Sequence, residues 1–376
     1  MTSSTHFPSR SRRHATRSVG VAGAAILVSS LLVASPPAEA APPTLTGIIV
    51  FQRADEGDQW QLWVANADLS NERQISAGPY TSGFATWNSD GSRIAFDSNR
   101  SDPDLTDDVS VNDVFTMNPD GSDVVQVTDS GSFAGDPGWS PDGKWLTFES
   151  DFNDYFGKAG IWVSRSDGSH LRRITAPADV HDGYWDTAPQ FSPDGKRLVF
   201  TRAFSFDDEG NIVDSALYVV NVDGTHAREL TATRDLVPGD ANWSPDGKTL
   251  TFETSGFPAT IRADGSQLRD LTPELAEGYA VGADPVYSPD GRQIMLLHAE
   301  FTSPTDVISS GLSVMGKNGN RLRYLPGDLT QATEEHQPDW VLAPRLVPAT
   351  SKSATTRSAS PPAPAQEHAA IYARRR

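Results

Sequence analysis

The stretch Trp139-Ser140-Pro141-Asp142-Gly143-Lys144-Trp145-Leu146-Thr147-Phe148 decides the fold, because its pattern recurs along the chain. Further copies of its aromatic-Ser-Pro-Asp-Gly start, one worn and one truncated, stand at Trp87, Phe191, Trp243, Tyr287 and Trp340. The six aromatic residues are separated by steps of 52, 52, 52, 44 and 53 residues. A fixed period of this size indicates a repeat architecture.

Each copy predicts a four-stranded antiparallel sheet. Pro after Ser sets φ for a tight turn, and Gly accepts the left-handed conformation that closes it. The alternating Leu146 and Phe148 after the turn are typical of a strand with one buried face. A second aromatic strand, an Asp-Gly turn and a short strand ending in a pair such as Val127-Thr128 complete the repeat.

The copies also predict how the sheets assemble. A sheet of about 40–50 residues cannot bury both faces alone, so the copies must stack around an axis. The N-terminal piece, residues 48–76, lacks the first strand of its repeat, and the C-terminal piece, residues 336–342, supplies only that strand. The sequence therefore predicts an all-β, six-bladed β-propeller of four-stranded antiparallel blades, closed by N-terminal strands plus one C-terminal strand.

The motif resembles the repeat of the PD40, or TolB-like, family of six-bladed propellers, which reads roughly aromatic-Ser-Pro-Asp-Gly-x-x-Ile-x-Phe. The resemblance covers residues 44–343. It implies the propeller fold and is compatible with an envelope protein that binds other proteins. Similar propellers also serve as gates of prolyl-oligopeptidase-type hydrolases and as the body of oligogalacturonate lyases. No Gly-x-Ser-x-Gly elbow occurs in the sequence, so the hydrolase arrangement is not expected.

The segments outside the propeller predict export. Residues 1–40 combine a basic start, an apolar stretch over residues 19–34 and the cleavage pattern Ala38-Glu39-Ala40, as in a signal peptide. An uncleaved anchor is the alternative, and Ser11-Arg12-Arg13 leaves the Sec and twin-arginine routes open. We expect the propeller over residues 41–343 and a disordered, basic Pro/Ala/Ser-rich tail over residues 344–376. The mature protein is expected to be secreted or periplasmic, monomeric and without a membrane span.

The propeller is strongly acidic. The chain has a net charge of −18, which becomes −21 without residues 1–40 and about −26 for the propeller alone. This charge argues against nucleic acid and anionic membranes as partners, and it favours cations, basic proteins or simple solubility. The chain contains no cysteine, which excludes a lipid-anchored cysteine and structural disulfides.

The two ends of the predicted propeller differ. Because the strands alternate in direction, the Pro-Asp-Gly and second Asp-Gly turns share one end, which we call the turn face. The opposite end, the long-loop face, carries the long connections 97–113, 150–160, 176–187, 203–216, 273–283 and 299–311. Long loops on a rigid scaffold usually carry function.

The innermost strands start at the long-loop face. The residues three positions before the repeat aromatics are Phe84, Asp136, Ala188, Asp240, Asp284 and Gln337. Equivalent positions form a ring, so these side chains are expected to converge on the mouth of a central channel, with His336 beside them. The predicted ligand-binding residues are Asp136, Asp240, Asp284, His336, Gln337, His181 and Asp186.

A ring rich in oxygen suits calcium, another hard cation or a basic group of a ligand. His181, His298 and His336 all map to the same end and, with Gln or carboxylates, can hold a transition metal. The alternative is that each Asp caps local backbone or faces water, and that the histidines fall there by chance.

Two functions remain open from the sequence. The first is a non-enzymatic, exported binding or scaffold module that holds a protein partner, a carbohydrate or a small ligand at the long-loop face. The second is a polysaccharide-active enzyme, either a lyase or a glycoside hydrolase with carboxylates or a metal at the channel mouth. A glycosidase needs two carboxyl groups about 5–10 Å apart, a distance that the sequence does not supply.

Overall fold

The computed structural model divides the chain into two units, Met1–Thr44 and Leu45–Arg376. It describes residues 44–55, 59–102, 105, 111–129, 131, 133–152, 159–175, 184–207, 212–231, 236–254, 257–271, 279–281, 283–303, 306–325, 335–343 and 346. The predicted signal peptide and nearly all of the predicted tail lie outside these residues. Within them, no helix has the length and apolar character to cross a membrane.

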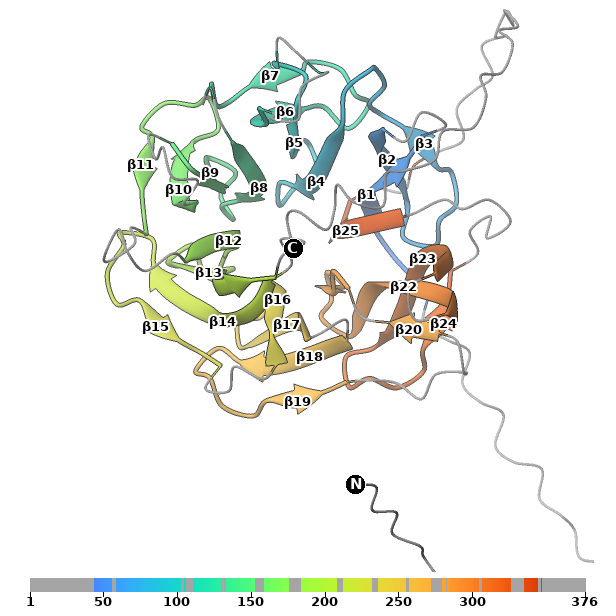
Figure 1. The fold of residues 1–376 in the computed structure, drawn as a ribbon. Coiled ribbons are helices and arrows are strands. Elements are labelled where there is room, and N and C mark those ends of the chain that lie inside the picture. Colours follow the sequence, from blue (N-terminus) through green and yellow to red (C-terminus); the bar gives the residue numbers. More distant parts are fainter. Residues whose placement is uncertain are drawn as a thin grey trace, which may run out of the picture. The chain divides into compact units, whose positions relative to one another are not determined.

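Six β-sheets surround a central axis, as Figure 1 shows. Blade 1 contains β4 (Ser82–Trp87), β5 (Ile94–Ser98), β6 (Asp113–Met117) and β7 (Val125–Gln126). Blade 2 contains β8 (Ala134–Trp139), β9 (Trp145–Ser150), β10 (Gly160–Arg165) and β11 (Arg172–Arg173). Blade 3 contains β12 (Trp185–Phe191), β13 (Arg197–Phe206), β14 (Ile212–Asn221) and β15 (Arg228–Glu229).

The remaining blades close the ring. Blade 4 contains β16 (Pro238–Trp243), β17 (Thr249–Thr254), β18 (Phe257–Arg262) and β19 (Arg269–Asp270). Blade 5 contains β20 (Tyr279–Val281), β21 (Val286–Tyr287), β22 (Gln293–Ser303), β23 (Asp306–Gly316) and β24 (Arg323–Tyr324), with β20 and β21 both paired to β22. Blade 6 contains β25 (Glu335–Val341), β1 (Ile48–Ala54), β2 (Trp60–Asn66) and β3 (Arg73–Gln74).

The predicted fold and closure are confirmed. The C-terminal β25 pairs with the N-terminal β1, with Val341 opposite Ile48 and Trp340 opposite Ile49. Asp339 then ties this closing blade to blade 1, because its carboxylate accepts hydrogen bonds from Thr86 Oγ1 at 2.9 Å and from the Trp87 backbone N–H at 2.7 Å.

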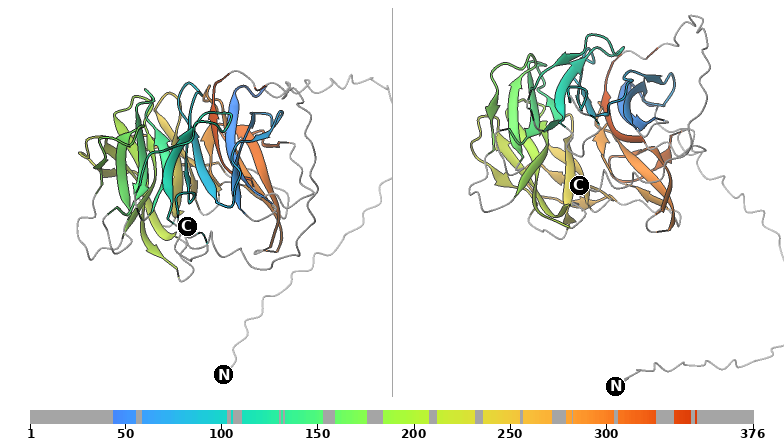
Figure 2. Two further views of the ribbon diagram at one scale, coloured as in Figure 1. Left: turned by 90° about the horizontal axis from the view of Figure 1, so that it is seen from above. Right: turned by 45° about the horizontal axis from the view of Figure 1, so that its top comes forward.

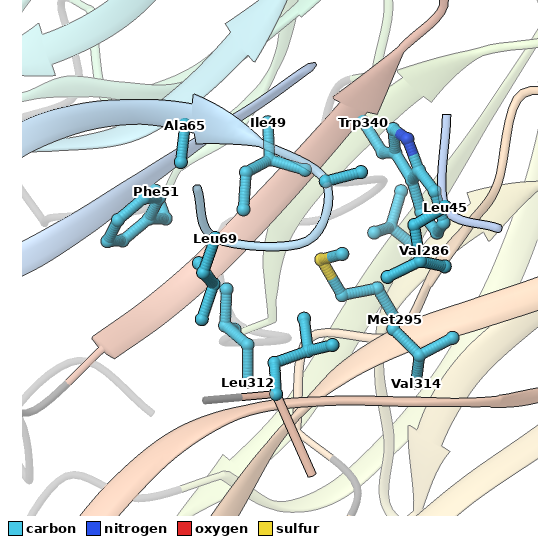
Figure 3. Packing of buried hydrophobic residues seen from close by; sticks show 12 residues of the cluster. Leu45, Ile49, Phe51, Ala65, Leu69, Val286, Met295, Leu312, Val314 and Trp340 are labelled. Carbon is cyan, nitrogen blue, oxygen red and sulfur yellow. The ribbon is translucent and has the colours of Figure 1, made fainter. Parts of the chain in front are cut away.

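The motif residues form the core between the blades. The largest fully buried side chains include the repeated motif phenylalanines Phe51, Phe96, Phe148, Phe200 and Phe252. Between blades 5 and 6, Met295 and Val314 pack in one cluster with Ile49 and Trp340 (Figure 3). The apolar periodicity of the sequence therefore records the contact surface between neighbouring sheets.

A second repeated contact joins the outer edges of neighbouring blades in five places, at Gly121, Gly168, Gly224, Gly265 and Gly319. The hydroxyl of Thr128, just after the short outer strand β7, accepts a hydrogen bond from the Val114 backbone N–H at 2.9 Å. Ser76, Thr175 and Thr231 do the same in their blades. The Gly of the next Asp-Gly turn then lies against the carbonyl just before this hydroxyl residue, as Gly168 lies against Val127 O.

The hairpins on the long-loop face differ in length. Strands β13 and β14 stay paired as far as Phe206 and Ile212, and β22 and β23 as far as Ser303 and Asp306. Both hairpins reach the same side in the edge-on view of Figure 2. Between them, β17 and β18 end at the pair Thr254 and Phe257, which explains the short 44-residue step of the repeat.

Candidate functional site

A β-bulge in the innermost strand places the predicted ring residues. Phe84, Asp136, Ala188, Asp240 and Asp284 all have positive φ, with values of 49°, 48°, 50°, 46° and 52°. In blades 1 to 4 the register with the second strand shifts at this point, as between Gly135 and Gly138. A bulge re-aims a side chain, and non-glycine residues in the left-handed region persist only where the surrounding structure enforces them. Gln337 lies in β25, and its side chain is outside the described part.

The bulges open a cavity of about 80 Å³ on the axis of the propeller. The cavity is lined by Phe84, Ala85, Thr86, Asp136, Pro137, Ala188, Gln190, Asp240, Ala241, Asn242, Asp284, Pro338 and Asp339. Four of these residues are aspartates, and none is Lys, Arg or His. The structure therefore brings together Asp136, Asp240 and Asp284 from three blades, as the ring hypothesis predicts.

A second row of acids stands beside the ring, and the sequence reasoning missed it. Asp97, Glu149 and Glu253 each follow the motif Phe on the second strand of a blade. Each is paired with a glycine just before the bulge, for example Glu149 with Gly135. The glycine also leaves room for the acid of the neighbouring blade, since a Cβ on Gly135 would come within 2.6 Å of Asp97 Oδ2. The repeated Gly opposite an acid was the signal available in the sequence.

The acids are close enough to act on one ligand. Oxygen atoms of Asp240, Glu253 and Asp284 all lie within 4.8 Å of one another. Burial raises the pKa of Asp136 well above its ordinary value, and the charges of Glu149, Asp97 and Asp240 raise it further. Thr187 Oγ1 donates a hydrogen bond to Asp136 at 3.2 Å and offsets part of this effect. Such a group suits a hard cation or a basic side chain, since either relieves the repulsion.

Asp136→Asn is expected to stabilise the protein at neutral pH by about 1–2 kcal/mol in the absence of added cations. Because the pKa of Asp136 is higher in the folded state than in the unfolded chain, the folded protein keeps a proton that the unfolded chain loses above about pH 4. The stability of the wild-type protein therefore falls as the pH rises from about 4 through the raised pKa. Urea unfolding at pH 4 and pH 7.5 measures this, and the gain of the variant should vanish at pH 4. An equal effect at both pH values would contradict the electrostatic explanation.

The other predicted ligand residues have different surroundings. Asp186 is buried and accepts two hydrogen bonds from Arg202, at 2.6 and 2.7 Å, so its carboxylate is already engaged by a structural ion pair. His298 is also buried, with Nδ1 2.8 Å from Ser313 Oγ, and it does not line the cavity. His336 lies in β25 opposite Gln52, but its side chain is outside the described part, as is all of His181.

Comparison with known proteins agrees with this architecture. No family model matches the chain. An uncharacterized protein of Agrobacterium fabrum is 32% identical over 37% of this chain and 46% of its own. The Tol-Pal system protein TolB of Francisella tularensis is 26% identical over 47% of this chain and 38% of its own. The chain thus spans less than half the length of the curated relatives it matches.

Solved structures extend the similarity over most of the propeller. TolB from Acinetobacter baumannii superposes with a TM-score of 0.60 at 20% identity, covering 81% of this chain and 68% of its own. The chain is a TolB-like six-bladed β-propeller. A putative TolB from Agrobacterium tumefaciens, with a TM-score of 0.54 at 17% identity, covers 80% of this TolB-like propeller and 99% of its own chain.

Proposed function

We propose that this TolB-like propeller is an exported binding module that holds a cationic group of a protein partner in its acidic channel mouth. The observation that carries the proposal is the cavity whose described lining contains four aspartates and no basic residue, backed by the second row of Asp97, Glu149 and Glu253. The signal-like residues 1–40 support export to the periplasm or beyond. The relatives named as Tol-Pal system proteins support a protein as the partner.

Electrostatics favours a cation at this position for a simple reason. Several carboxylates within a few ångströms repel one another more strongly in a partly buried cavity than in water, so a bound positive charge offsets a cost already present in the free protein. Both a Lys or Arg side chain and a divalent cation such as calcium supply a positive charge of this kind. We propose that the charge comes from a basic side chain of a protein, and the experiment tests a metal ion separately.

A polysaccharide-active hydrolase or lyase is the second candidate. One observation favours it: a carboxyl group with a raised pKa, Asp136, stands among other carboxylates, which is the arrangement of an acid and base pair in glycoside hydrolysis. Release of reducing or unsaturated sugars from neutral and acidic polysaccharides, lost in Asp136→Asn, would support this candidate in place of the first.

The binding proposal is tested with a double variant in which Asp240→Asn and Asp284→Asn are combined. Isothermal titration calorimetry of the full chain uses an oligolysine peptide in one arm and calcium or manganese chloride in the other. The expected result is peptide binding that weakens at least about 30-fold in the double variant, equivalent to about 2 kcal/mol. Asp142→Asn combined with Asp246→Asn removes the same charge from the turn face and is the matched control.

The arms separate the sources of the charge. Binding of metal alone, lost in the double variant, would identify the cavity as an ion site and overturn the protein-partner proposal. Peptide binding that the control variant weakens as much as the double variant would show that only net charge matters, and would also overturn it.

A further inference from the structure

An apolar cluster lies on the long-loop face directly beside the acidic cavity. Trp185 contacts Phe133 of the preceding blade at 6.4 Å and Phe206 of its own blade at 6.3 Å between ring centroids. Phe206 is 39% exposed, although its ring packs against that of Trp185. We call Phe133, Trp185 and Phe206 the aromatic cluster. None of them belongs to the repeat motif.

The chain connects this cluster to the cavity. Phe133 stands three residues before Asp136, and Trp185 stands two residues before Thr187, whose hydroxyl donates to Asp136 at 3.2 Å. At the rise of an extended strand, Phe133 and Trp185 lie about 10 Å or less from Asp136. A segment with a bulky apolar side chain two or three residues from a basic one can therefore occupy both places at once.

The rings of the cluster are inclined to one another by 58° and 66°. Rings tilted in this way present their edges to a further aromatic side chain, whereas a sugar ring stacks on a flat ring face. The acidic surroundings select a positively charged neighbour for that side chain. The cluster thus fits a basic peptide segment better than a carbohydrate.

The chain contains such a segment outside the described residues. Its last residues are Ile371-Tyr372-Ala373-Arg374-Arg375-Arg376, in which an aromatic side chain stands two residues before the first of three arginines. The described chain ends at Leu346, whose backbone N–H donates to Asn66 Oδ1 at 2.8 Å and whose carbonyl accepts from Asn71 Nδ2 at 3.2 Å. Leu346 lies beyond the predicted propeller end at residue 343, and thirty residues follow it.

We propose that the C-terminal residues 371–376 bind the long-loop face of their own propeller, with Tyr372 against the aromatic cluster and the arginines at the acidic mouth. The 24 residues between Leu346 and Ile371 give a root-mean-square reach of about 25–30 Å and a much longer maximum, so the segment can pass around the propeller. Tethering supplies an effective concentration in the millimolar range, so even weak contacts keep the mouth partly occupied. The tail is then an internal competitor of an external basic partner. This inference rests on the proposed function.

A competition experiment tests the inference with a synthetic peptide of residues 366–376. Its binding by fluorescence anisotropy is compared between the full chain and a tail-silenced full chain carrying Tyr372→Ala, Arg374→Ala, Arg375→Ala and Arg376→Ala. The silenced chain should bind the peptide at least about tenfold more tightly, because its own tail no longer competes. Adding the exposed-site change Phe206→Ala to the silenced chain should weaken binding several-fold, and a scrambled peptide is the control.

A cross-linking experiment decides which propeller is bound. A photoreactive benzoylphenylalanine replaces Tyr372 in the full chain, and cross-links are mapped by mass spectrometry in a mixture of isotopically light and heavy chains. Cross-links to β12 or β13 within one isotope population support the inference. Mixed-isotope cross-links, or equal peptide affinity for the wild-type and silenced chains, overturn it. If oligolysine still binds in an Asp240- and Asp284-dependent way, the proposed function stands while this inference fails.

Discussion

Gly121→Ala is expected to lower the free energy of unfolding by about 3 kcal/mol or more. Gly121 has φ of +84°, which an alanine adopts only with strain. In addition, its Cβ would lie much closer to Ile75 O, a backbone atom of the neighbouring blade, than the sum of the two van der Waals radii. Backbone cannot rotate away as a side chain can, so blades 6 and 1 would have to separate. Urea unfolding followed by tryptophan fluorescence measures the loss.

Gly131→Ala is the matched control for this prediction. Gly131 also has positive φ, +63°, but no atom lies within 4 Å of the position of its Cβ. It should therefore lose only the conformational term, about 1 kcal/mol. Equal losses in the two variants would mean that the contact between the Asp-Gly turn and the adjacent blade does not contribute to stability.

His298 is expected to make the protein less stable as the pH falls from about 6.5 to 4. Burial lowers the pKa of His298 from 6.5 to about 4, and a contact with the Gly311 backbone offsets part of that effect. The unfolded chain therefore binds a proton in this window while the folded chain does not, so acid favours unfolding. The loss amounts to about 3 kcal/mol at most across the window.

The measurement is chemical denaturation of the wild-type chain and of His298→Gln at intervals between pH 4 and pH 7.5. Glutamine keeps a polar partner for Ser313 Oγ, which lies 2.8 Å from His298 Nδ1, but it does not titrate. The difference in stability between the two proteins should change with pH in favour of the variant as the solution becomes acidic. His226→Gln, at an exposed turn, should leave the pH profile unchanged. Parallel profiles for wild type and His298→Gln would refute the prediction.

The raised carboxyl pKa values act in the opposite direction. Burial raises the pKa of Asp339 as it does that of Asp136, so both groups make the folded state more stable as acid is added. The net profile of the wild-type chain is the sum of these opposing effects. Comparison of single variants, and not the profile of one protein, is what separates the histidine from the acids.

The candidate site shows how far the repeat can be read. Equivalent positions in a repeat occupy equivalent places around the axis. The position three residues before each repeat aromatic was therefore enough to predict that Asp136, Asp240 and Asp284 lie around one cavity. The cause of their inward direction, a bulge with positive φ, left no clear mark in the sequence, since Phe84 and Ala188 adopt the same conformation as the aspartates. Because different residue types share this positive φ, the conformation is imposed by the propeller architecture and not by the residue at the position.

The sequence by itself determined the fold class, the number of blades and the closure by β25. These features follow from local chemistry, namely turn residues that restrict φ and apolar residues with period two, repeated at a nearly constant spacing. The tertiary structure alone decided which polar groups lie together at one site. Asp186 is engaged by Arg202 and His298 is buried beside Ser313, whereas Glu253 joins Asp240 and Asp284. The physical reason is that burial and charge coupling depend on side chains from different strands and blades, whose distances no local pattern encodes.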